Sequence, residues 1–166
     1  MNNEITMSNQ AVANLNPAGA TLLEMRSNPS AFPRVSSVPR EAAIFEMTKI
    51  VTQAFLYRGQ TTDLATINFI STSVVDELLA DKVYNASSIS FAEIQVIVKR
   101  EILSGDVFGV SVASIYRIIL DYVKGEGHLL QKQVNDRITK DRKVNPTLDT
   151  MLSAYSSKLI NNNKIK

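Results

Sequence analysis

After Pro39, apolar residues recur at intervals of three and four along the chain, which is the spacing of one helix face. The first run begins at Pro39, a residue that suits a first helical turn, and ends near Gly59. A second run follows Thr62, a capping residue, and a third opens with the capping-box pair Ser90 and Glu93. The spacing predicts three helices, over about 39–58, 62–83 and 90–104.

The second half of the chain continues this pattern. Ser111 is placed to cap a strongly apolar helix that ends at the break "GEG", residues 125–127. A polar helix follows, with a narrow apolar stripe of Leu130, Val134 and Ile138. Thr147, after an Asn-Pro pair, is placed to start a last helix.

Residues 1–38 are interrupted by prolines and rich in Asn, Ser and Ala, so only one short helix is predicted there, capped by Asn16. Its apolar residues Leu22, Leu23 and Met25 are candidate partner-binding residues. The favoured interpretation, however, is an arm that is disordered or packs loosely on the body.

These patterns predict an all-α fold, a bundle of five to six helices with a partly extended N-terminal arm. Alternating strand patterns are lacking, although the run "VFGVSV" leaves a short strand as an alternative there. Three segments are expected: the arm (1–38), a helical core (39–125) and a basic C-terminal helical extension (126–166).

Charge is unevenly distributed although the net charge is only +2. Residues 1–123 carry a net charge of −3, and residues 124–166 carry +5. Such asymmetry is compatible with contact with an anionic partner, but a solvated charged helix is the favoured interpretation. The candidate nucleic-acid-binding residues are Lys132, Arg137, Lys140, Arg142 and Lys143, with Asp136 on the same helix face.

The sequence lacks the residues that several kinds of catalytic and ligand-binding site require. Cysteine is absent, and none of the six glycines forms a phosphate-binding loop motif. His128 is the only histidine and is expected to be exposed to solvent. We therefore expect a protein that is not an enzyme and uses no cofactor or metal. The first ten residues lack a secretory signal and no run is long enough for a membrane span, so a cytoplasmic protein is expected.

The stretch "GVSVASIYR", residues 109–117, resembles the GVS-x-x-T-[IV]-Y-R pattern of recombinase and repressor helix-turn-helix units. The resemblance implies base contacts from Ser111, Ser114 and Arg117. Gly105 stands where such units carry a small helix-forming residue, and the helix has a single basic residue on the face that would meet DNA. The apolar spacing instead favours a core helix that buries Ile115 and Ile119.

The segment "EIQVIVKREILSGDVFGVSVASIYRIILDY", residues 93–122, resembles the helical core of small proteins encoded by phages and mobile elements of gut bacteria. In these proteins a helix ends near a glycine, a short turn follows, and a second helix closes on an aromatic residue. The resemblance implies an accessory protein of DNA replication, such as an adaptor that loads a helicase.

Three hypotheses follow. The first is a non-enzymatic adaptor of phage or mobile-element DNA metabolism, which binds a protein partner such as a replicative helicase and touches nucleic acid nonspecifically in the host cytoplasm. The second is a phage structural protein that oligomerises through the arm and the apolar stripe. The third is a sequence-specific regulator that uses the helix-turn-helix pattern.

Overall fold

The computed structural model describes residues 19–105 and 109–144, and no strand occurs among them. The described residues form α2 (Leu22–Ser27), α3 (Arg40–Tyr57), α4 (Leu64–Ala80), α5 (Phe91–Ser104), α6 (Val112–Lys124) and α7 (Glu126–Val144). Two short 3₁₀ turns, η1 (Val35–Ser37) and η2 (Ala86–Ser88), complete the described elements. The prediction of an all-α fold is confirmed.

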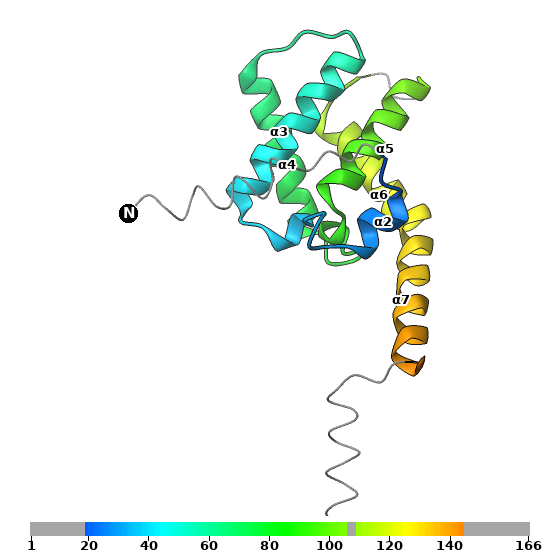
Figure 1. Ribbon diagram of the computed structural model, residues 1–166. Helices are drawn as coiled ribbons and strands as arrows, with labels where there is room; N and C mark the ends of the chain where they lie inside the picture. Colours follow the sequence, from blue (N-terminus) through cyan, green and yellow to red (C-terminus); the bar gives the residue numbers. More distant parts are fainter. Residues whose placement is uncertain (1–18, 106–108, 145–166) are drawn as a thin grey trace, which may run out of the picture. The chain divides into compact units, whose positions relative to one another are not determined.

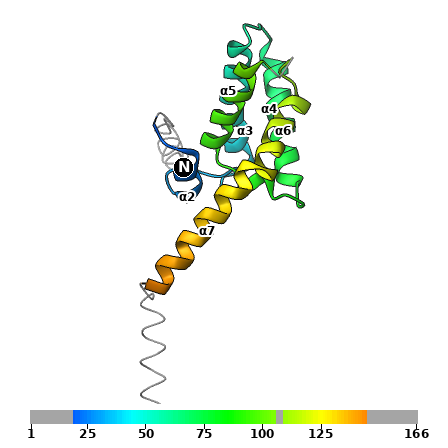
Figure 2. The same cartoon turned by 90° about the vertical axis from the view of Figure 1, so that its right-hand side faces the viewer.

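Helices α3, α4, α5 and α6 enclose the hydrophobic core (Figures 1 and 2). Helix α3 packs against α4 and α5, and α6 packs against the same two helices, so each helix has two neighbours. Apolar residues at helical spacing point inward from all four because burial of apolar surface drives folding. The fully buried side chains include Met47, Val51, Val74, Leu78, Ile94, Ile97, Ile115 and Ile119.

The chain divides into two compact units between Leu130 and Gln131, inside α7. The sequence-based expectation placed this boundary at residue 126, where the "GEG" break lies. The break itself is present, because α6 ends at Lys124 and α7 begins at Glu126. Gly127 packs closely on α6, since a Cβ there would lie 3.0 Å from the ring and from the backbone carbonyl of Tyr122.

The helix starts follow capping chemistry, with two corrections. Asp63 caps α4 in place of Thr62, because its carboxylate accepts the backbone N–H of Thr66 at 2.6 Å, which lowers the pKa of that carboxyl. Thr21 caps α2 through a capping box with Glu24, whereas Asn16, the predicted cap, lies outside the described residues. The predicted caps of α5 and α6 are confirmed.

The described part of the N-terminal segment is fixed to the body. Val35 and Met25 are buried at 0% and 1% exposure. The backbone N–H of Val35 donates to the carbonyl of Ile89 at 3.0 Å, and that of Phe91 donates to the carbonyl of Pro33 at 3.3 Å. The segment is therefore anchored to the body at Met25, Arg26 and Val35, whereas residues 27–31 between these anchors are exposed.

A buried ion pair joins α2 to α5. Nε of Arg26 lies 2.7 Å from Oε1 of Glu93, and the two side chains are 4% and 1% exposed. The Tyr122 hydroxyl of α6 donates to the same Glu93 oxygen at 2.8 Å, and the Ser90 backbone N–H and hydroxyl donate to the other oxygen at 2.9 Å. The Arg26 guanidinium also lies 5.7 Å from the Tyr122 ring centroid, within cation–π range.

Removing Arg26 tests this ion pair. We expect Arg26→Met to lower the free energy of unfolding by about 3–5 kcal/mol, because the Glu93 carboxylate is left buried without its cation. Arg40→Met is the matched control, since Arg40 pairs with Asp76 at 2.7 Å on the surface, where both side chains are about half exposed. Urea denaturation of both variants measures the difference, and equal decreases in stability would contradict this role of Arg26.

The hydroxyl of Tyr122 predicts a pH dependence. Burial raises the pKa of this phenol well above its ordinary value, and the neighbouring Glu93 carboxylate raises it further. The folded state therefore keeps this proton at pH values where the unfolded chain has released it, and stability falls as the pH rises above about 10. Tyr122→Phe should therefore lose less stability than the parent protein between about pH 9 and about pH 11.

Candidate functional site

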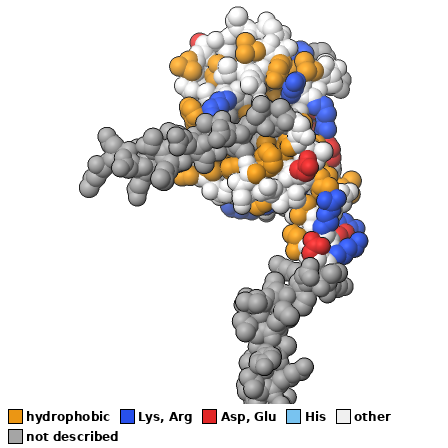
Figure 3. All heavy atoms as spheres, in the orientation of Figure 1, with side chains coloured by type: hydrophobic (Ala, Val, Ile, Leu, Met, Phe, Trp, Pro, Cys, Tyr) orange, Lys and Arg blue, Asp and Glu red, His pale blue; other side chains and the backbone are white. Residues whose placement is uncertain are grey.

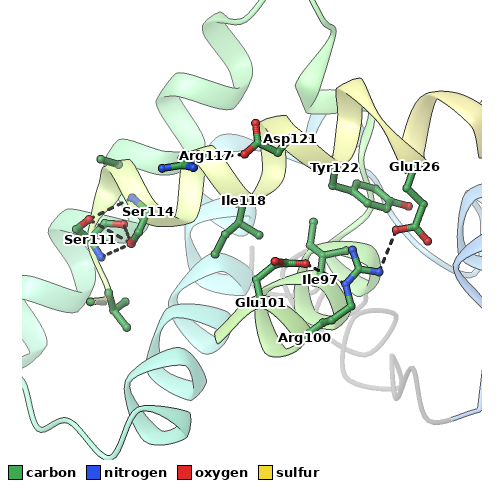
Figure 4. A pocket seen from close by; sticks show the side chains of 13 residues that line it. Ile97, Arg100, Glu101, Ser111, Ser114, Arg117, Ile118, Asp121, Tyr122 and Glu126 are labelled. Carbon is green, nitrogen blue, oxygen red and sulfur yellow. Dashed lines mark hydrogen bonds and ion pairs between the residues drawn. The ribbon is translucent and has the colours of Figure 1, made fainter. Parts of the chain in front are cut away.

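Helices α5 and α6 border a groove of about 690 Å³ in the first unit (Figure 4). Its apolar lining comes from Ile97 of α5 and from Val110, Ile118 and Tyr122. Its polar lining consists of Arg100, Glu101, Ser111, Ser114, Arg117, Asp121 and Glu126. The volume falls within the range of ligand-binding pockets, so the groove is the first candidate binding site.

The local sequence explains how the two helices come to face each other. Gly105 ends α5 with a φ of +89°, a left-handed conformation that residues with a Cβ rarely adopt. Ser111 restarts the chain as a helix, because its hydroxyl accepts the Ser114 backbone N–H at 3.1 Å and the Ser114 hydroxyl accepts the Ser111 backbone N–H at 2.9 Å. Both serines are therefore occupied in starting α6.

The charged side chains of the groove pair with one another. The Arg100 guanidinium binds two carboxylates, with Nε 3.0 Å from Glu101 and Nη1 2.9 Å from Glu126. The hydrogen bond from Arg100 to Glu126 is the main cause of a raised pKa at Arg100. On α6, Arg117 lies 3.5 Å from Asp121, which is longer than a good hydrogen bond.

This geometry weighs against base recognition by α6. Ile115, Ile118 and Ile119 are buried, and Val112 and Tyr116 pack partly buried against the core, as the core-helix interpretation requires. Arg117 is 84% exposed, but it shares its surface with carboxylates that repel phosphate. The helix-turn-helix candidates Ser111, Ser114 and Arg117 instead line one wall of the groove.

Substitution of Ser111 separates capping from binding. Ser111→Ala should lower the free energy of unfolding by about 1 kcal/mol, because the first turn of α6 loses an acceptor. Ser111→Asp should retain most of the stability, since a carboxylate caps equally well. Thermal or urea unfolding measures both, and an aspartate as damaging as alanine would contradict the capping role.

The basic candidates lie on α7, where Figure 3 shows Lys and Arg side chains with acidic ones between them. Lys132, Arg137 and Lys140 are exposed, and none of them forms an ion pair or hydrogen bond with another described residue. The side chains of Arg142 and Lys143 lie outside the described part of the chain. Ile138 of the predicted apolar stripe is 45% exposed and Val134 is 6% exposed, while Leu130 packs against the core.

The predicted partner-binding residues of α2 are less accessible than the sequence indicates. Met25 is in the core at 1% exposure, which removes it from an exposed binding surface. Leu22 and Leu23 are half-buried, and Leu22 packs against the core. Leu22 and Met25 pack inward beside Arg26, which pairs with Glu93 of α5.

Sequence reasoning missed the charged residues on α5 and at the start of α7 that line the groove. The spacing of Arg117 and Asp121, four apart, indicates one pair, but nothing local indicates that Arg100 meets Glu126. Among residues 19–105 and 109–144, no three His, Cys, Asp or Glu side chains gather to hold a metal ion, and His128 is exposed. Nor does any helix in those two ranges have the length and apolar character of a membrane span.

Comparisons of the chain with models of protein families, with curated proteins and with solved structures gave no match.

Proposed function

We propose that the protein is a non-enzymatic helical adaptor of phage or mobile-element DNA metabolism, acting in the host cytoplasm. In this proposal its first unit binds a protein partner, for which a replicative helicase is the candidate. Helix α7 contacts a nucleic-acid backbone without sequence preference. The resemblance of residues 93–122 to phage-encoded helical proteins supports the source, and the charges of α7 support the nucleic-acid contact.

One contrast between the two units carries the proposal. Each Lys or Arg described between residues 19 and 130 makes an ion pair, a hydrogen bond, a ring contact or another electrostatic interaction. Lys132, Arg137 and Lys140 make none with the described residues, although all three are exposed. Cations that the chain does not neutralise itself are available to an external anion.

The expected contact is weak and sensitive to salt. Phosphate contacts by Lys and Arg release counterions, so affinity falls as salt rises. Asp136 and Asp141 lie among the cations of α7 and lower the local potential. Readout of bases is not expected, because α7 presents flexible cations rather than a fixed set of side chains that match base edges.

The oligomerising alternative has one observation in its favour, the exposure of Leu129 and Ile138 at 61% and 45%. Within the first unit, Leu130 of the predicted stripe packs against the core. A continuous seam for helix–helix contact therefore has few members left. Molar mass in solution separates this alternative from the adaptor.

A charge-matched pair of variants tests the nucleic-acid contact. Lys132→Gln, Arg137→Gln and Lys140→Gln together should lower affinity for a labelled DNA duplex. The slope of log affinity against log salt should fall in magnitude by up to about 2.7, because each of the three phosphates that these side chains would neutralise contributes about 0.9 to it. The control changes Lys49, Lys82 and Lys99 to Gln, which removes the same charge from the first unit. Glutamine preserves helix propensity, and circular dichroism checks the helix content.

The control should keep the affinity and salt slope of the parent protein. An equal decrease in DNA affinity in both triple variants would show that only the net charge of the protein matters, and it would contradict a contact at α7. Unchanged binding in the α7 variant, with Arg142→Gln and Lys143→Gln added, would contradict it equally.

A further inference from the structure

The groove between α5 and α6 carries an excess of negative charge. Three carboxylates, those of Glu101, Asp121 and Glu126, line it against two guanidinium groups. Arg100 is shared between Glu101 and Glu126, so neither carboxylate has a cation of its own. Asp121 is 65% exposed and only loosely paired with Arg117.

Apolar side chains lie between the charged groups. In Figure 4, Ile118 points from α6 toward Ile97 of α5, with Arg117 and Asp121 on one side and Arg100, Glu101 and Glu126 on the other. A ligand that fits must therefore combine an apolar centre with flanking charge. The flanking charge must be positive, because the two guanidinium groups of the groove neutralise its three carboxylates only in part.

We propose that this groove binds a short basic amphipathic segment of a protein partner, with an apolar side chain seated between α5 and α6 and Lys or Arg residues meeting Glu101, Asp121 and Glu126. The inference rests on the proposed adaptor function only in requiring a protein partner, and it makes no use of α7. Nucleic acids, acidic peptides and anionic lipid surfaces are disfavoured occupants, since the three carboxylates would repel them.

Ala113 provides a way to block the groove without touching its charges. Ala113 is exposed on α6 and lines the groove, so a tryptophan there occupies space that a ligand needs. Ala65, exposed on the first turn of α4 and absent from the groove, is the matched control for the added indole. Glu126→Gln removes one groove carboxylate, and Glu77→Gln, at an exposed position of α4, is its control.

The binding experiment uses the full chain and two labelled 18-residue helical peptides, one of leucine and lysine and one of leucine and glutamate, followed by fluorescence anisotropy. The lysine peptide should bind more tightly than the glutamate peptide, and added salt should weaken it. Ala113→Trp should lower its affinity by about tenfold or more, and Glu126→Gln by about threefold. Ala65→Trp and Glu77→Gln should leave it unchanged.

Three outcomes would overturn the inference. The first is a glutamate peptide that binds as tightly as the lysine peptide. The second is equal affinity of Ala113→Trp and Ala65→Trp while both keep the melting temperature of the parent protein. The third is a dimer of the full chain that Ala113→Trp dissociates, which would make a second copy the occupant. Any of these leaves the salt dependence of α7 intact, so failure here is distinguishable from failure of the nucleic-acid contact.

Discussion

The carboxylate of Glu93 is the point on which the first unit depends. It closes the capping box of α5, accepts the Tyr122 hydroxyl of α6, and pairs with Arg26 of α2. Helices α2, α5 and α6 therefore meet at one carboxylate that is 1% exposed. A buried charge of this kind is tolerated only when its lone pairs are satisfied, which makes the placement of all three helices mutually dependent.

This dependence explains which features were predictable from the sequence. The helices of the body, and the caps Ser90 and Ser111, follow from apolar spacing and local capping chemistry, which act over three to four residues. The ion pair of Arg26 with Glu93 spans 67 residues, and no local pattern contains it. The expectation of a loosely packed arm fails at Met25, Arg26 and Val35, which are buried, because the composition of the arm does not indicate a contact with a residue 67 positions away.

Of the two candidate sites, one was predictable from the sequence and the other was not. The cations of α7 were predictable because charge is a property of the sequence, and exposure follows on a helix that is polar around most of its circumference. The groove was not predictable, because its negative excess arises when Glu126 reaches the same guanidinium as Glu101. Arg117 illustrates the difference: the sequence presents it as a base-reading residue, whereas its neighbours in the fold are carboxylates.

The two proposed surfaces demand partners of opposite charge, and this opposition has a physical consequence for specificity. A nucleic-acid backbone that approaches the carboxylates of the groove is repelled, and a lysine-rich peptide is repelled by the cations of α7. Each surface therefore disfavours the ligand of the other, because repulsion between like charges raises the free energy of the wrong complex. A chain whose net charge is only +2 can in this way present two selective surfaces, because selectivity depends on where the charges lie rather than on their sum.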